Sequence, residues 1–331
     1  MPTAPTMLFE LQDGCLRLVF PDRPSFQLWN TPAPPSLTVC RAYPADAARS
    51  QSFYAVEMDK INGLTFFFSG GRLFGLHVHQ LGESCAMDSW TRAFSNRRRQ
   101  SIVWIYVPMS KRDRPLPLGI REGLQSRTQS IVIRTKLVGD VIVGMQCKGA
   151  ARDCSLGTSA PLTMIYGEPQ QGNLVGFFGA YCRVPVDKGL TKPFSLPNPC
   201  GSPIGDEAYF SWAPLSGVSS TLVFCDESNG ACRGILLRYR NGGARAVGQC
   251  RLQVDPTEGV AHPDQFCFRV DSCPSRFNRL LYIVRVIVRV KFKQTPQASR
   301  IVEDEGWESR QMEGMIKFWF TPESCFVVVE D

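Results

Sequence analysis

Residues 281–293, LYIVRVIVRVKFK, alternate apolar and basic side chains with a period of two. Successive side chains of a β-strand point to opposite faces, so this period predicts a strand with one face in the core and one in water. The basic face can bind an anion, but charges on an exposed strand also oppose aggregation between strand edges, which is the simpler explanation. The apolar face carries Val284, Val286, Val288, Val290 and Phe292, and the opposite face carries Arg285, Ile287, Arg289, Lys291 and Lys293.

Shorter runs of the same kind recur along the chain, separated by glycine and polar turns. Helical periodicity is confined to two segments, MDSWTRAFSNRRR at 87–99 and VEDEGWESRQM at 302–312, where we expect short helices. Many short strands with few helices are typical of closed or stacked β architectures, so the predicted fold class is all-β. We expect further strands near residues 15–20, 63–68, 74–79, 102–107, 131–134, 140–143, 162–166, 174–178, 221–225, 234–239, 246–252, 265–270, 315–320 and 326–329.

The chain has 331 residues, which is enough for two domains of ordinary size. Residues 188–206 are rich in proline and glycine and poor in strand signals, so they are the best candidate for a linker. The linker separates a first unit at 46–187 from a second β-rich unit at 207–331. Residues 1–45 are then an N-terminal strand segment ahead of the first unit.

A short internal match relates the two units. Leu64 and Phe66 in the first unit align with Leu222 and Phe224 in the second, and each pair lies in a predicted hairpin. The second antiparallel unit is therefore a candidate diverged repeat of the first.

The formal charge of +7 is spread over 331 residues, of which 20% are charged. The densest basic cluster, Arg97–Arg99, has no interleaved aromatic side chains, so we interpret it as a solvated loop and expect no nucleic-acid partner. The first residues lack the pattern of a signal peptide, and no apolar run approaches about 18 residues. We therefore expect a soluble, cytoplasmic protein without a membrane partner. The sequence carries no signal for an oligomeric state.

The thirteen cysteines are odd in number, irregularly spaced and free of any CxxC pair. That pattern favours free, buried thiols in a reducing compartment over a zinc site or a disulfide framework. A secreted disulfide protein is the alternative, and it needs an export route.

No catalytic signature is present in the sequence. There is no GxSxG elbow and no glycine-rich phosphate loop between a strand and a helix. The acidic clusters at 303–305 and 330–331 lie in a polar turn and at the chain end, whereas acid–base catalysis needs carboxylates in differing, partly buried environments. We therefore predict no enzyme activity, no catalytic residue and no cofactor, with a cysteine- or metal-dependent enzyme as the least favoured alternative.

Two histidines and two tryptophans are the remaining candidates for a site. His77 and His79 are two apart on a predicted strand and so share a face, but a metal ion needs a third ligand, for example Cys85 or Glu83. A surface or cross-strand role explains the pair more simply, so no metal is expected. Trp90 and Trp307 lie in polar surroundings and are the better candidates for exposed binding residues; the tryptophans within apolar strand patterns are expected in the core.

Three segments carry a family resemblance: GLTFFFSGGRLFGLHVH at 63–79, QSIVIRTKLVGDVIVG at 129–144 and NLVGFFGA at 173–180. In this order they resemble the jacalin-related lectin domain, a three-sheet β-prism, over residues 53–187. The resemblance implies a β-prism first unit and a sugar-binding loop after Phe178, in which backbone N–H groups and a carboxylate bind sugar hydroxyls. The ligand-binding residues implied in this way are Gly179, Ala180, Tyr181, Arg183 and Asp187.

The function implied by the resemblance is non-enzymatic, lectin-like carbohydrate recognition. The chain departs from the family pattern at Cys182 and Val186, where the family has a glycine and an aspartate. That departure favours the alternative, an intracellular structural or protein-interaction scaffold that has lost the sugar site. The expected partner is accordingly a carbohydrate or a protein ligand.

Overall fold

A computed structural model describes residues 8–12, 15–19, 28–43, 52–80, 85–110, 112–113, 115–124, 128–147, 149–158, 161–169, 172–182, 193–197, 201–274, 284–294 and 306–331. Strands dominate these residues, and the predicted all-β class is confirmed. No helix in this part of the chain is long and apolar enough to cross a membrane.

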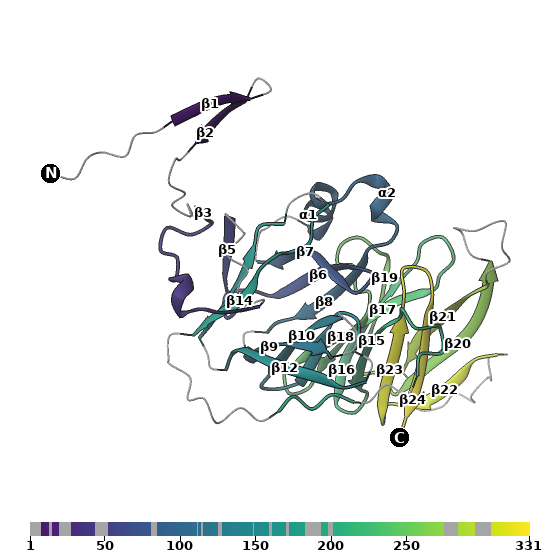
Figure 1. The fold of residues 1–331 in the computed structure, drawn as a ribbon. Coiled ribbons are helices and arrows are strands. Elements are labelled where there is room, and N and C mark those ends of the chain that lie inside the picture. The colour runs from purple at the N-terminus through teal and green to yellow at the C-terminus, as the bar shows by residue number, and fades with distance from the viewer. Residues whose placement is uncertain are drawn as a thin grey trace.

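The strands before residue 183 form one hairpin and three larger sheets (Figure 1). We call the three larger sheets, with the helices between them, the first unit. Its helices are α1 (Ala86–Ala93), α2 (Asn96–Arg99) and the short 3-10 helix η1 (Leu37–Val39). The hairpin pairs β1 (Leu8–Gln12) with β2 (Cys15–Val19). The five-stranded sheet has the spatial order β3 (Leu28–Trp29), β5 (Ser52–Glu57), β13 (Leu162–Gly167), β14 (Phe178–Cys182) and β4 (Arg41–Tyr43). The three-stranded sheet has the order β7 (Arg72–His79), β6 (Gly63–Ser69) and β8 (Val103–Pro108), and the four-stranded sheet has the order β11 (Gly139–Val143), β10 (Gln129–Thr135), β9 (Pro115–Gly123) and β12 (Ala151–Gly157).

The strands after residue 207 form three further sheets, which we call the second unit. None of the described sheets mixes strands from the two units. Both units hold three sheets, while the β-prism itself stays a prediction. The sheets of the second unit are β15 (Tyr209–Pro214), β23 (Met315–Phe320) and β24 (Cys325–Glu330); β18 (Ala244–Gly248), β17 (Cys232–Tyr239), β16 (Val218–Cys225) and β19 (Thr257–Ala261); and β21 (Val284–Lys293), β20 (Gln265–Pro274) and β22 (Glu308–Gln311).

The alternating segment forms β21 as predicted, antiparallel to β20. Val288, Val290 and Phe292 on its apolar face are at most 6% exposed. Ile287 on the opposite face is also buried, at 4%. The second face of β21 is therefore covered at Ile287, while Arg289, Lys291 and Lys293 on the same face are partly exposed.

Two expectations about local structure are wrong. The strand expected at 174–178 begins only at Phe178, because that is where the chain pairs with β13 and β4. The helix expected within 302–312 is replaced over Glu308–Gln311 by β22, which pairs with β20, while residues 301–305 lie outside the described residues. Pairing with a distant strand outweighs local helix propensity in this second case.

The predicted helix at 87–99 is confirmed as α1 and α2, joined at Phe94 and Ser95. The paired hairpins of the proposed repeat are also present, as β6–β7 and β16–β17. Both hairpins shift register close to the turn, between Phe67 and Phe68 in one and between Phe224 and Cys225 in the other.

Segments outside the two predicted β units pack against the first unit. From residues 1–45, β3 joins the five-stranded sheet beside β5, and β4 joins it beside β14. From the proline-rich linker, Phe194 lies under the guanidinium of Arg134 at 5.0 Å, and Ser195 N donates to Asp140 Oδ2 at 2.6 Å. The linker therefore follows the surface of β10 and β11 at these residues.

A continuous apolar core joins the two units. The largest cluster of buried apolar side chains runs from Leu64 and Ile133 in the first unit to Ile235 and Phe318 in the second. Strand β8 of the first unit also lies next to β18 of the second. The units are thus packed on each other through their interiors.

Arg245 on β18 of the second unit forms hydrogen bonds with the backbone at the turn between β10 and β11. Its guanidinium is 5% exposed, donates to Val138 O at 3.0 Å and to Asp140 O, and stacks on Trp212 at 4.7 Å. Burial lowers the pKa of Arg245 to about 10. The nearby carboxylate of Asp140 is already bound by Arg134 at 2.5 Å, so Arg245 relies on backbone carbonyl groups.

Candidate functional site

A cavity of about 600 Å³ lies between the two units, and we call it the interunit cavity. Its volume is within the roughly 300–1,000 Å³ typical of small-molecule sites. The first unit contributes side chains from α1, α2 and the start of β8, and the second unit contributes the turns that follow β16, β18 and β23. The lining residues are Trp90, Arg99, Gln100, Ile102, Asp226, Asn229, Ala231, Cys232, Arg233, Gln249, Arg251, Ile287, Phe320, Thr321, Pro322, Glu323, Ser324 and Cys325.

The turn between β16 and β17 is held by its own side chains. Asp226 Oδ1 accepts from the backbone N–H of Ser228 at 2.9 Å, and Asn229 Oδ1 accepts from Ala231 N at 2.8 Å. Gly230 has a φ of +67°, which favours glycine. Side-chain bonds of this kind fix the backbone of a turn, so Asn229 and Asp226 line the cavity from a defined backbone.

The turn between β23 and β24 is built in the same way. Thr321 Oγ1 accepts from Ser324 N at 2.9 Å and from Glu323 N at 3.2 Å. Thr321 N donates to Ser324 O at 2.8 Å. The backbone that carries the hydroxyl and carboxylate groups of this turn is therefore held in place at the edge of the cavity.

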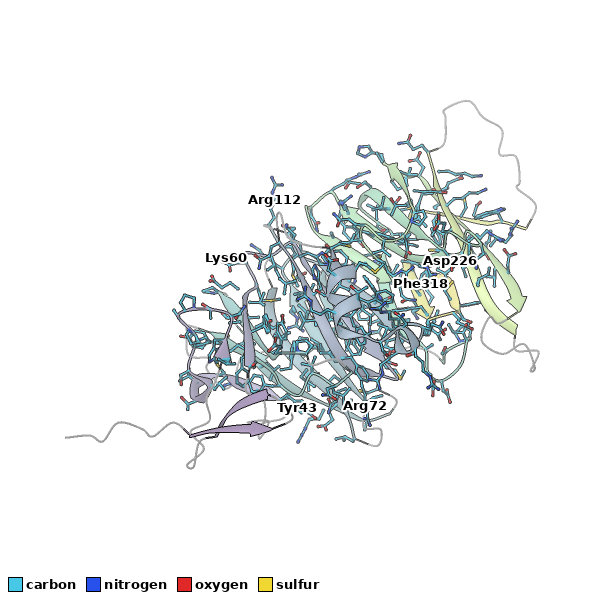
Figure 2. All side chains as sticks on the ribbon, turned by 90° about the horizontal axis from the view of Figure 1, so that it is seen from above. Tyr43, Lys60, Arg72, Arg112, Asp226 and Phe318 are labelled. Atoms are coloured by element: carbon cyan, nitrogen blue, oxygen red, sulfur yellow. The ribbon has the colours of Figure 1, made fainter. Side chains whose placement is uncertain are left out.

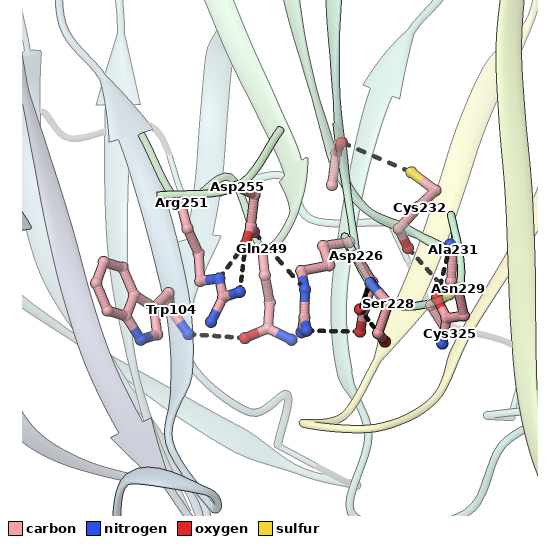
Figure 3. A network of polar contacts seen from close by, with 12 residues as sticks. Trp104, Asp226, Ser228, Asn229, Ala231, Cys232, Gln249, Arg251, Asp255 and Cys325 are labelled. Carbon is pink, nitrogen blue, oxygen red and sulfur yellow. Dashed lines mark hydrogen bonds and ion pairs between the residues drawn. The ribbon is translucent and has the colours of Figure 1, made fainter. Parts of the chain in front are cut away.

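Two arginines and two aspartates form a connected network along the cavity (Figure 3). Arg251 binds both carboxylate oxygens of Asp255, donating from Nε at 2.7 Å. Arg233 donates to Asp226 Oδ2 at 2.6 Å and lies 3.7 Å from Asp255 Oδ2. Each guanidinium is thus paired with a carboxylate, so this part of the wall is polar but has little net charge.

Gln249 lies next to this network, because its backbone N–H donates to Arg233 O at 2.7 Å, and its side chain reaches Trp104 in the first unit (Figure 3). It is 5% exposed, accepts from Trp104 N at 3.1 Å and donates to Thr321 O at 3.1 Å. Strand β8 lies at the edge of its sheet, so Trp104 N has no neighbouring strand on that side. The glutamine side chain satisfies this edge group and the β23–β24 turn at once.

Trp90 on α1 brings an indole ring to the cavity wall. Arg99 lies over the ring at 5.0 Å, and the ring of Trp104 lies 5.6 Å away. Trp90 Nε1 is buried, and within the described part of the chain it has no hydrogen-bond acceptor. A ligand with an acceptor oxygen at this wall would satisfy it.

Trp307, the other tryptophan expected to be exposed, is not among the residues that line this cavity. Lys291 lies 3.9 Å from the centre of its ring, and Arg269 lies 5.5 Å from it. Two cations therefore already occupy positions over this ring.

The residues predicted from the family resemblance lie elsewhere, in the first unit. Gly179, Ala180 and Tyr181 are in β14, between β13 and β4. A Cβ at Gly179 would lie 2.7 Å from Arg41 O, and Ala180 is 1% exposed. Tyr181 is partly buried against the cluster of Phe53, Ile165 and Phe177. Arg183 and Asp187 lie outside the described residues, so the five-residue carbohydrate site stays a prediction.

The two histidines share a face of β7, with ring centres 4.6 Å apart. His77 shares a hydrogen bond with Ser89 Oγ at 2.8 Å, and His79 shares one with Thr65 Oγ1 at 2.7 Å. Burial and the neighbouring His77 lower the pKa of His79 to about 4. Glu83 lies outside the described residues, and the described residues contain no group of three His, Cys, Asp or Glu side chains able to hold a metal ion.

Ten cysteines of the described residues are free thiols, and two of these, Cys232 and Cys325, line the interunit cavity. Cys325 Sγ donates to Cys232 O at 3.2 Å. Complete burial raises the pKa of the Cys232 thiol well above its usual value. A neutral, buried thiol is a poor nucleophile, so we do not expect Cys232 to react as one.

Trp90, which the sequence predicts to be an exposed binding residue, is partly buried in the wall of the interunit cavity, and its role in binding stays a prediction. The rest of this cavity was not identified from the sequence. Its other polar groups come from turns at 226–233, 249–251 and 321–325, which are far apart in the chain. Turn-forming residues such as Asp226 and Asn229 can be recognised between the predicted strands. The sequence does not show which turns lie next to one another in the fold. Among known proteins, no family model and no curated protein matches this chain.

Proposed function

We propose that the protein is a non-enzymatic binding protein whose ligand is a carbohydrate held in the interunit cavity. The observation that carries the proposal is the composition of the cavity wall, where compensated Arg–Asp pairs and amide groups stand beside an indole ring. Sugars are uncharged, carry many hydroxyl groups and have an apolar ring face. Planar polar side chains and an aromatic ring match those three properties.

The charge balance of the wall argues for a neutral ligand over an anion. Arg233 and Arg251 are both engaged by carboxylates. The third arginine, Arg99, donates to Phe94 O at 2.8 Å and to Thr91 O at 2.6 Å, so backbone carbonyl groups hold its guanidinium. Binding an anion here would compete with these partners, whereas hydroxyl groups can add to them.

The alternative function is a protein-interaction scaffold. One observation favours it: β4 packs against β14, and the backbone of Arg41 leaves no room beside Gly179. The sugar contact that the family resemblance implies at that residue is therefore not open on this side. A scaffold needs no such contact, and a carbohydrate would have to bind at the interunit cavity instead.

A glycan array with the full chain tests the proposal. We expect at least one glycan to bind, and isothermal titration calorimetry with that glycan then locates the site. Trp90→Phe keeps a ring but removes the indole N–H, and Gln100→Ala removes an exposed amide at the same wall. Each variant should weaken binding by about 2- to 10-fold, the worth of one hydrogen bond.

Two further variants serve as controls for the location. Trp307→Phe makes the same change away from the interunit cavity and should leave the affinity unchanged. Asp187→Ala tests the loop implied by the family resemblance. Absence of any bound glycan refutes the carbohydrate proposal and leaves the scaffold; a loss confined to Asp187→Ala places the sugar in that loop and refutes the interunit site.

A further inference from the structure

A second cavity of about 260 Å³ lies inside the first unit, and we call it the first-unit cavity. Four of its wall residues belong to the core and are at most 5% exposed: Phe68, Ile120, Ile131 and Phe178. They come from β6, β9, β10 and β14, so three different sheets meet around this space. An apolar guest would gain contacts here that the unfilled walls lack.

Local backbone features create the space beside Phe68. The pairing of β6 with β7 shifts register between Phe67 and Phe68, which bends the hairpin at this point. The hairpin turn contains Gly71 with a φ of +72°, where a Cβ would already contact Met145 and Thr128 at 3.4 Å. The gap is therefore set by the hairpin geometry and not by one missing side chain.

The segment before β14 joins the cavity to the surface. Leu174 lines the cavity and is 42% exposed, although it is a large apolar side chain. Val175 lines it too, and its N–H donates to Leu73 O at 3.0 Å. Gly176 has no atom within 4 Å of where a Cβ would be. An apolar guest would cover the exposed part of Leu174 as it enters.

One charged side chain, that of Arg72, is among the residues that line the first-unit cavity. Arg72, the first residue of β7, is exposed and lines the cavity, and its side chain has no hydrogen-bond or ion-pair partner among the residues that the structure describes. Figure 2 shows Arg72 and Tyr43 on the same side of the first unit. The Tyr43 hydroxyl is engaged, since it donates to Glu122 Oε1 at 2.7 Å and accepts from Gln129 Nε2 at 3.1 Å. Arg72 is thus the group at this site available for a charged ligand.

We propose that the first-unit cavity binds a small amphipathic monocarboxylate, with its carboxylate on Arg72 and its apolar chain between Phe68, Ile131 and Leu174. One unpaired guanidinium suits a single carboxylate, which it can bind through two N–H groups. The volume is slightly below that of ordinary ligand sites and so admits a ligand of about ten non-hydrogen atoms. This site is independent of the interunit cavity and of the carbohydrate proposal.

Calorimetry on the full chain with octanoate and with 1-octanol tests the inference. Octanoate should bind with a Kd of about 1 mM or below, which is reasonable for a ligand of this size. Arg72→Gln should weaken octanoate binding about tenfold and leave octanol binding unchanged. Leu174→Ala should weaken both ligands, because both use the apolar wall.

The matched control is Arg240→Gln, which removes an exposed arginine that does not line the cavity. Far-UV circular dichroism verifies that each variant is folded, which is expected because the altered side chains are exposed. The inference is overturned if octanoate does not bind, if Arg72→Gln acts no more strongly than Arg240→Gln, or if Arg72→Gln weakens octanol as much as octanoate. Trp90→Phe should leave octanoate binding intact, whatever its effect on a glycan.

Discussion

Gln249 gives the sharpest test of how the two units are joined. Its amide is buried, with one hydrogen bond to the edge strand β8 and one to the β23–β24 turn. Leucine has a similar size but offers neither group. In a Gln249→Leu variant, Trp104 N would be buried without a partner, and Thr321 O at the cavity wall would lose its donor.

The expected loss of stability follows from those two groups. A buried polar group that loses its partner costs about 1–3 kcal/mol. The unpartnered Trp104 N–H, together with the lost bond to Thr321 O and partly offset by the gain from burying leucine, gives a decrease of about 1–3 kcal/mol in the free energy of unfolding. Against a typical stability of about 5–15 kcal/mol, that decrease is easily measured.

Urea unfolding, followed by tryptophan fluorescence and far-UV circular dichroism, measures the change. Gln311→Leu makes the same replacement on the exposed strand β22 and should change stability by no more than about 0.5 kcal/mol. If Gln249→Leu costs as little as this control, Trp104 N and Thr321 O have other partners. The account of the glutamine as a bridge between the units is then wrong.

Two further predictions concern titration and thiol chemistry. Folding lowers the pKa of His79 from 6.5 to about 4, so the unfolded chain takes up a proton first as the pH drops. The free energy of unfolding should therefore decrease by about 2–3 kcal/mol between pH 6.5 and 4. Urea unfolding midpoints across this range should show the decrease, and His79→Gln should remove that part of the pH dependence. Cys232 and Cys250 are at most 1% exposed and burial raises the pKa of both thiols, so an alkylating reagent followed by mass spectrometry should modify them only in urea; their labelling at native conditions, at the rate of part-buried thiols, would contradict this.

Much of the fold was predictable from the chain's local patterns. The two-residue alternation of β21 identified its buried face, because packing on one side of a sheet imposes that pattern. The helix at 87–99 was predictable for the same kind of reason, as a local property. The strand at Phe178–Cys182 was placed four residues early, because Leu174 and Val175 have strand-like composition but line a cavity mouth.

The remaining differences arise from contacts between distant segments. Strand β22 has four exposed residues and no apolar alternation, so only its pairing with β20 makes it a strand. The interunit cavity depends in the same way on which turns meet. Trp90 was singled out because a large ring in polar surroundings is informative by itself, while Asn229 and Gln249 are informative only beside their partners.

Arg245 opposes separation of the two units that enclose the interunit cavity. Moving the units apart would strip a buried guanidinium from two carbonyl groups and from Trp212. These contacts therefore oppose any opening of the interunit cavity by separation of the two units.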